Sequence, residues 1–135
     1  MKLLQDKHIF LLEDDPVNFA VIQTILRREG AHPVLDHWGD TSLKKLLNHP
    51  FKIDLILLDL MLPRKRSGYE VYDMIQTVSE LRDIPVIVVS AADPDVEIPL
   101  VKAKGMQGFI SKPINHHLFV KQLVSVLNGE AIWDE

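Results

Sequence analysis

The segment Ile53–Pro63 constrains the fold of this chain more than any other, because it joins a strongly apolar run to a single acid. Leu55–Leu58 are all apolar, Asp59 follows them at once, and a proline comes four residues later. An apolar run of this length that ends in turn-forming residues is typical of a strand buried on both faces of a parallel sheet. A carboxylate at the end of such a strand is poorly placed for packing, so we interpret Asp59 as a residue with a chemical role.

Five strand–helix pairs can be predicted along the sequence. The predicted strands are Ile9–Leu12, Pro33–Asp36, Leu55–Leu58, Pro85–Val89 and Gly108–Ile110. The helices after them carry apolar residues at helical spacing and are predicted to begin near Pro16, Thr41, Gly68, Pro94 and Asn115. Strict alternation of strands and helices predicts an α/β fold with a parallel sheet and helices on both faces. We expect a doubly wound (βα)5 sandwich, flavodoxin-like, with five strands in the order 2-1-3-4-5.

The fourth predicted helix contains a proline. Asp93 and Pro94 resemble an N-cap and a first helical residue, but Pro99 follows five residues later. An interior proline removes a backbone hydrogen bond and costs about 3 kcal/mol. We therefore expect this helix to be distorted early or to start near Glu97.

Length and composition indicate a single domain at residues 1–135, with a core at about 8–128 and a short tail at 129–135. The net charge of −4 argues against a nucleic-acid surface, which is normally basic. Without cysteine, neither a disulfide nor a thiolate metal site can form. The start does not resemble a signal peptide and no apolar run spans a membrane, so we expect a cytoplasmic protein without a membrane partner.

Charged and polar residues follow four of the predicted strands. Glu13 and Asp14 follow the first strand, Asp59 the third, Ser90 the fourth and Lys112 the fifth. Because the carboxyl ends of parallel strands share one edge of the sheet, we expect these side chains to meet in one crevice. Two carboxylates 4 Å apart repel by about 4 kcal/mol at an effective dielectric of 20. A bound Mg²⁺ would relieve that repulsion, and oxygen ligands are those it prefers.

These residues carry a resemblance to a known family. The sequence resembles the receiver domain of two-component response regulators from Ile9 to about Leu127, and the matching positions are Glu13-Asp14, Asp59 with Pro63, Ser90-Ala91 and Lys112-Pro113. The resemblance implies that Asp59 is the phosphoacceptor, a nucleophile that takes a phosphoryl group from a sensor histidine kinase or a phosphotransfer protein. It also implies a Mg²⁺ (or Mn²⁺) site formed by Glu13, Asp14, Asp59 and the backbone carbonyl of Met61.

The resemblance also implies a conformational change on phosphorylation and the residues that take part in it. Lys112 and Ser90 would bind the phosphoryl oxygens, Phe109 would be the switch aromatic, and the bond before Pro113 is a candidate cis peptide. A downstream protein would bind the face formed by the fourth helix, fifth strand and fifth helix, and the domain would be a monomer or a weak homodimer. The added charge of the phosphoryl group would bias two pre-existing conformations.

Three other functions are compatible with parts of the sequence. A phosphorylation-independent receiver that acts only as an interaction module would keep the same fold. An aspartate-nucleophile phosphohydrolase is less favoured, because related enzymes have a second acid two residues after the nucleophile, where this chain has Met61. A nucleotide- or flavin-binding module would need a glycine-rich phosphate loop, whereas the first predicted strand runs into acids. We therefore expect no enzyme activity beyond the domain's own phosphorylation and autodephosphorylation.

Several residues depart from the family pattern. Met61 and Ala92 are apolar where polar side chains can orient an attacking water, which predicts slow autodephosphorylation. The loop after Pro63 carries three basic residues, Arg64–Arg66, which we interpret as a solvated loop rather than one that steers an acidic partner. The six histidines are scattered along the sequence, and we expect them to be ordinary polar residues.

Overall fold

The computed structural model of the protein describes residues 2–37, 39, 41–62 and 67–133. The basic loop at Arg64–Arg66 and the Pro63 position therefore lie outside the described residues. The strands are β1 His8–Leu12, β2 His32–Asp36, β3 Leu55–Leu58, β4 Val86–Ser90, β5 Gly108–Ser111 and β6 Ile132–Trp133. The helices are α1 Pro16–Arg28, α2 Ser42–Asn48, α3 Gly68–Gln76, α4 Pro94–Lys104 and α5 His116–Leu127.

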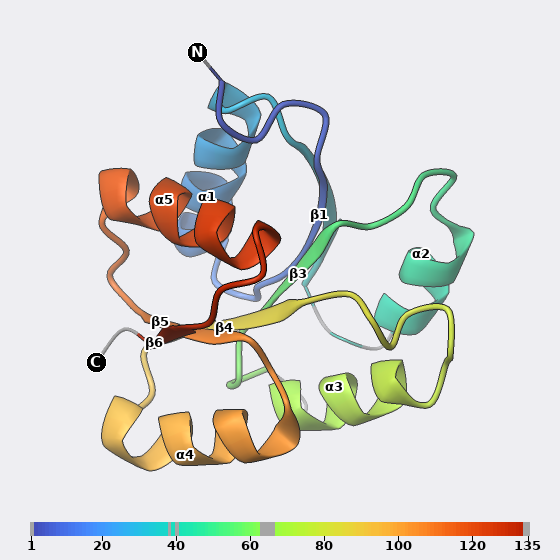
Figure 1. The fold of residues 1–135 in the computed structure, drawn as a ribbon, viewed down its shortest axis with the longest axis vertical. Coiled ribbons are helices and arrows are strands. Elements are labelled where there is room, and N and C mark those ends of the chain that lie inside the picture. The colour runs from blue at the N-terminus through green and yellow to red at the C-terminus, as the bar shows by residue number, and fades with distance from the viewer. Residues whose placement is uncertain (1, 38, 40, 63–66, 134–135) are drawn as a thin grey trace.

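The strands form one parallel sheet in the order β2-β1-β3-β4-β5-β6. Figure 1 shows α1 and α5 together on one face and α2, α3 and α4 on the other. Each face has its own apolar cluster, so β3 and β4 in the centre are buried on both sides along their whole length. The α/β class, the flavodoxin-like topology and the order 2-1-3-4-5 of the first five strands are confirmed.

Local sequence explains the start of α1. The Asp15 carboxylate accepts hydrogen bonds from the backbone N–H groups of Val17 and Asn18, and Pro16 occupies the first helical position. Proline suits that position because its missing N–H would have no intrahelical partner. This turn holds the acids at the end of β1 in a fixed place next to the helix.

The prediction of five strands and a short tail is wrong in one respect, because residues 132–133 form a sixth strand. Ile132 and Trp133 pair in parallel with Gly108 and Phe109 of β5. Gly108 permits this pairing, since a Cβ atom on it would lie 2.9 Å from the Ile132 carbonyl oxygen. Two apolar residues carry too little periodicity to predict a strand, and the pairing depends on the free edge of β5.

The prediction that the fourth helix starts near Glu97 is also wrong. α4 begins at Pro94 and is α-helical without interruption to Lys104. The Asp93 carboxylate caps it by accepting a hydrogen bond from the backbone N–H of Asp95, 3.0 Å away. Pro99 lies on the exposed side of the helix, where water can satisfy the carbonyl that loses its partner.

Candidate functional site

Three carboxylates meet at the carboxyl end of the sheet, at the junction of β1 and β3. These strands pair with Leu12 opposite Leu58, so that Glu13 and Asp59 leave the sheet side by side. The backbone N–H of Asp59 donates to the Leu12 carbonyl oxygen over 3.1 Å, which extends the pairing by one residue. Ligand oxygens of Glu13, Asp14 and Asp59 lie within 4.8 Å of one another.

Lys112 reaches the same place from the end of β5. Its ammonium group contacts the Glu13 carboxylate and lies 3.1 Å from Oδ2 of Asp59. The Lys112 side chain is only 10% exposed and those of Glu13 and Asp59 are 1% and 8% exposed. One cation therefore serves two buried carboxylates, and Asp14, half-buried, adds a third negative group beside them.

Burial and charge change the titration of these groups. Burial raises the pKa of Glu13 to about 7, against the opposing effect of its hydrogen bond and attraction to Lys112. The negative charge of Asp59 raises this pKa further. For Lys112, burial acts to lower the pKa, but the hydrogen bond to Glu13 and the attraction of Asp59 outweigh it and leave the pKa raised. Lys112 therefore stays charged, and ionisation of Glu13 adds a negative charge to the site as the pH rises through about 7.

Backbone donors orient both buried carboxylates. The N–H of Met61 donates to Oδ1 of Asp59, and the N–H of Asp15 donates to Oε2 of Glu13, each over 3.1 Å. These contacts leave Oδ2 of Asp59 facing Lys112. They were not predicted, because a main-chain donor has no signature in residue type.

Gly68, predicted only as the start of a helix, also supports the site. A Cβ atom at this position would lie 2.3 Å from the backbone carbonyl oxygen of Asp59. Its N–H donates to the Leu60 carbonyl oxygen over 3.0 Å. Only glycine lets the start of α3 approach the backbone around Asp59 this closely.

Ser90 and Phe109 lie on the neighbouring strands. The Ser90 side chain is fully buried at the end of β4, and its Oγ accepts a hydrogen bond from the N–H of Ala92 over 3.1 Å. The Ser90 carbonyl oxygen accepts from the N–H of Lys112 over 2.9 Å, which joins the ends of β4 and β5. Phe109 is fully buried within the apolar cluster that α3 and α4 cover.

Two other predicted residues have clear positions. The peptide bond between Lys112 and Pro113 is cis, as expected. The Met61 side chain is 66% exposed, so it points away from the interior while its backbone stays next to Asp59.

The residues fit a hard divalent cation. All three acidic side chains offer oxygen atoms, and oxygens bound to one octahedral Mg²⁺ at about 2.1 Å lie roughly 3 to 4 Å apart. The spacing within 4.8 Å requires only small side-chain adjustments to reach that geometry. The single positive charge of Lys112 cannot balance three ionised carboxylates. The repulsion between the carboxylates therefore favours binding of a divalent cation.

None of the helices in the described residues is long and apolar enough to cross a membrane.

Curated relatives have closely matching lengths. The chain is 31% identical over 125 residues to the polar-differentiation response regulator DivK of Brucella anthropi. The matched residues cover 93% of this chain and 98% of that protein. The same identity and coverage hold for DivK of Brucella ovis.

Solved structures agree in fold. The receiver domain of the sensor histidine kinase PA1611 from Pseudomonas aeruginosa, solved with a magnesium ion in its active-site cleft, is 26% identical, with a TM-score of 0.78 over 93% of this chain and 99% of that one. The chemotaxis response regulator CheY4 of Vibrio cholerae is 21% identical, with a TM-score of 0.80 over 90% and 99%. The sequence model of the response regulator receiver domain family matches residues 9–124 of this chain. The chain therefore belongs to the response regulator receiver domain family of two-component signalling.

Proposed function

We propose that Asp59 is the phosphoacceptor of this receiver. One observation carries the proposal: Asp59 is held by the Met61 N–H at Oδ1, while Oδ2 lies 3.1 Å from the Lys112 ammonium group. This arrangement leaves one carboxylate oxygen beside a cation that can neutralise an incoming phosphoryl group. In the reaction, the bond from phosphorus to the donor histidine nitrogen breaks as the bond from phosphorus to the Asp59 oxygen forms.

Glu13, Asp14, Asp59 and the Met61 carbonyl would hold Mg²⁺, and Mn²⁺ has the same oxygen preference. When bound, the ion supplies positive charge for the phosphoryl oxygens during transfer. Lys112 would exchange part of its contact with Glu13 and Asp59 for contact with those oxygens. Ser90 would donate its hydroxyl hydrogen to one of them, because its oxygen already accepts from Ala92.

We propose that Phe109 responds to phosphorylation. It lies in β5, three residues before Lys112, and is fully buried against the α3–α4 side of the sheet. A movement of Ser90 toward the phosphoryl group would open space on the neighbouring strand that the Phe109 ring can fill. We propose that the resulting repacking alters the face of α4, β5 and α5 to which a downstream protein binds, and that β6 forms part of this face.

We do not expect this domain to turn over external phosphate esters. A phosphohydrolase would require a general acid near the leaving group. The residue two positions after Asp59 is Met61, whose exposed side chain cannot supply a proton. The donor is proposed to be a sensor histidine kinase or a phosphotransfer protein.

Incubation with acetyl phosphate or phosphoramidate and Mg²⁺ tests the proposal. We expect intact-protein mass spectrometry to show the gain of one phosphoryl group, which hydroxylamine removes and which Asp59→Asn abolishes. Chelation of Mg²⁺ with EDTA should prevent the gain in the wild-type protein. An unchanged mass in the folded wild-type protein would favour the phosphorylation-independent interaction module instead.

A further inference from the structure

A histidine at the end of β2 contacts the main chain that carries two of the acids. His37 directly follows β2, and its Nδ1 lies 3.3 Å from the backbone carbonyl oxygen of Glu13. Because a carbonyl oxygen can only accept, a hydrogen bond in this place requires the proton on Nδ1. His37, expected from the sequence to be an ordinary polar residue, therefore touches the acidic site.

Two consecutive residues hold the main chain of Glu13. The N–H of Glu13 donates to the carbonyl oxygen of Asp36 over 3.1 Å, and its own carbonyl oxygen faces the His37 ring. Rotation of the peptide group on either side of Glu13 would break one of these contacts. The end of β2 thus fixes the backbone at the point where the chain leaves β1.

The end of β2 is itself held by two helices. Asp36 is 1% exposed, and its Oδ2 accepts a hydrogen bond from the Ser42 hydroxyl of α2 over 2.6 Å. The half-buried ring of His37 packs against Phe19 of α1, with a centroid distance of 4.2 Å. The backbone before His37 is therefore fixed by α2, and its ring by α1.

The peptide group that contains the Glu13 carbonyl also leads into Asp14. Its orientation sets the direction in which the Asp14 side chain leaves the backbone relative to Glu13. We propose that His37 is a positioning residue for the divalent cation, because it holds this peptide group so that the three acids keep their spacing within 4.8 Å. The inference rests on the Mg²⁺ site proposed above. Groups that orient metal ligands without binding the metal change the affinity by about 10- to 100-fold.

Two substitutions separate the hydrogen bond from the packing of the ring. His37→Phe keeps an aromatic ring against Phe19 and has no donor for the Glu13 carbonyl. His37→Asn loses the ring but keeps a donor, because its amide nitrogen is as many bonds from the backbone as Nδ1 of histidine. A role in packing alone predicts that Phe is the better replacement, whereas the positioning role predicts that Asn is.

Titration of the full chain with Mn²⁺ tests the inference, with the electron paramagnetic resonance signal of free Mn²⁺ as the measurement. We expect one equivalent to bind to the wild type and His37→Phe to weaken binding by about tenfold. His37→Asn should retain most of the wild-type affinity. Circular dichroism and urea unfolding show that each variant is folded.

The rate of phosphorylation by acetyl phosphate, followed by intact-protein mass spectrometry, gives a second measurement. In His37→Phe, the Mg²⁺ concentration for half-maximal rate should rise by about tenfold, while the rate at saturating Mg²⁺ stays that of the wild type. A loss of folded protein would have the opposite pattern, because it lowers the rate in equal proportion at every Mg²⁺ concentration.

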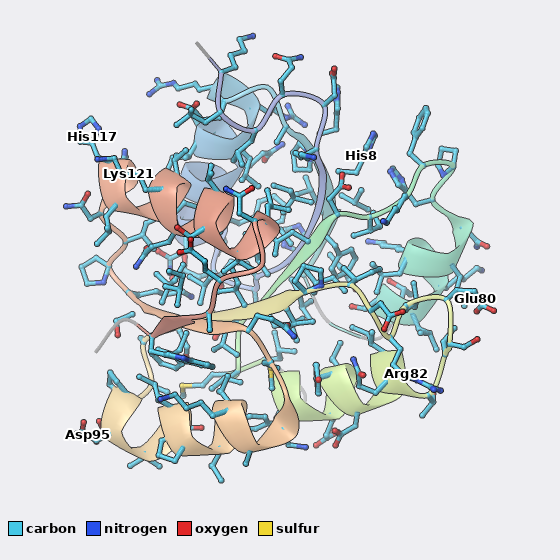
Figure 2. All side chains as sticks on the ribbon, viewed as in Figure 1. His8, Glu80, Arg82, Asp95, His117 and Lys121 are labelled. Carbon is cyan, nitrogen blue, oxygen red and sulfur yellow. The ribbon has the colours of Figure 1, made fainter. Side chains whose placement is uncertain are left out.

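His49→Phe is the matched control. His49 lies in a contact of three histidine rings with His8 and His32, the first residues of β1 and β2, and therefore at the amino edge of the sheet. Figure 2 shows His8 between β1 and the loop that follows α2. We expect the control to bind Mn²⁺ as the wild type does.

Three results would overturn the positioning role of His37. These are wild-type Mn²⁺ affinity in folded His37→Phe, an equal loss in His37→Phe and His37→Asn, and an equal loss in the control. A wild-type chain that binds no Mn²⁺ would overturn the proposed metal site, and the positioning role with it.

Discussion

At the scale of single residues, the acidic site depends on how one lysine is shared. Lys112 contacts Glu13 and lies 3.1 Å from Asp59, and all three side chains are almost fully buried. Buried ion pairs are costly to break, because the partner that remains is a charge without compensation. Removal of the charge of Lys112, Glu13 or Asp59 is therefore expected to lower the stability of the folded protein.

The raised pKa of Glu13 predicts how stability depends on pH. Because the folded-state pKa is about 7 against an ordinary value of 4.5, the folded protein binds this proton more tightly than the unfolded chain does. The stabilisation is complete below pH 4.5 and is lost as pH rises through 7. The Glu13→Gln variant has no carboxyl group to ionise at this position, so its stability should not change through this group. Between pH 4.5 and 8, the unfolding free energy of the wild type should therefore fall relative to that of the variant by at most about 3 kcal/mol.

Urea unfolding of both proteins in EDTA, at a series of pH values between 4.5 and 8, measures this difference. A difference in unfolding free energy that does not change with pH would contradict the assignment. Addition of Mg²⁺ should remove most of the pH dependence, since the ion favours the ionised carboxylate.

The Met61 side chain leads to a prediction about the lifetime of the proposed phosphorylated form. Its side chain is 66% exposed next to the proposed phosphoryl site and offers no hydrogen bond to an attacking water. We expect Met61→Asn to accelerate autodephosphorylation severalfold, because an amide can orient that water. The decay of phosphorylated protein after removal of the phosphodonor measures the rate, with Met61→Leu as an apolar control. Equal decay in the Asn and Leu variants would show that the side chain does not limit access of water.

At the scale of elements, β6 turns the free edge of β5 into a paired one. The N–H of Ile132 donates to the Gln107 carbonyl oxygen over 3.0 Å, and the Lys102 ammonium group lies 4.9 Å from the centroid of the Trp133 ring. A cation over a tryptophan face contributes about 0.5–1 kcal/mol at an exposed site. β6 is thus held by β5 on one side and by α4 on the other.

Gly108→Val should detach β6. A side chain there would lie within 2.9 Å of the Ile132 carbonyl oxygen, so either the pairing or the strand must move. We expect a cost of about 1 kcal/mol and a red shift of Trp133 fluorescence, measured in a Trp38→Phe background so that Trp133 is the only tryptophan. Trp133 emission that matches the Gly108 protein would show that β6 tolerates the side chain.

At the scale of the whole molecule, the sheet carries its acidic site at the carboxyl edge and a contact of three histidine rings at the amino edge. The acids and Lys112 follow the carboxyl ends of the strands, and the histidine cluster lies at the amino ends of β1 and β2. The two apolar clusters between them give the domain its rigidity, because the central strands are buried on both faces. An ion bound by the acids would therefore occupy a prearranged site and stabilise the whole fold.

Mg²⁺ should raise the thermal stability of the domain. At a concentration one hundred times the dissociation constant, a ligand that binds only the folded state stabilises it by about 2.7 kcal/mol. Differential scanning calorimetry should show a midpoint several degrees higher in MgCl₂ than in NaCl of equal ionic strength. Asp14→Asn should lose most of this rise while keeping the fold, and a full rise in that variant would exclude Asp14 as a ligand.

The sequence alone determined the class of fold and the residues of the acidic site. Alternating apolar runs and helical periodicity predict a parallel sheet, and a parallel sheet must bring all its carboxyl ends to one edge. The positions of Glu13, Asp59 and Lys112 followed from that constraint without any knowledge of contacts. Local patterns were sufficient because each of these residues directly follows a strand.

Only the tertiary structure decided the features that depend on strand register or on backbone groups. The donor from Met61 to Asp59 and the close approach of Gly68 involve main-chain atoms, which residue type does not reveal. The two-residue strand β6 has no periodicity of its own and forms because β5 offers an edge. The cluster of His8, His32 and His49 exists because parallel pairing and the end of α2 join positions that are far apart in the chain.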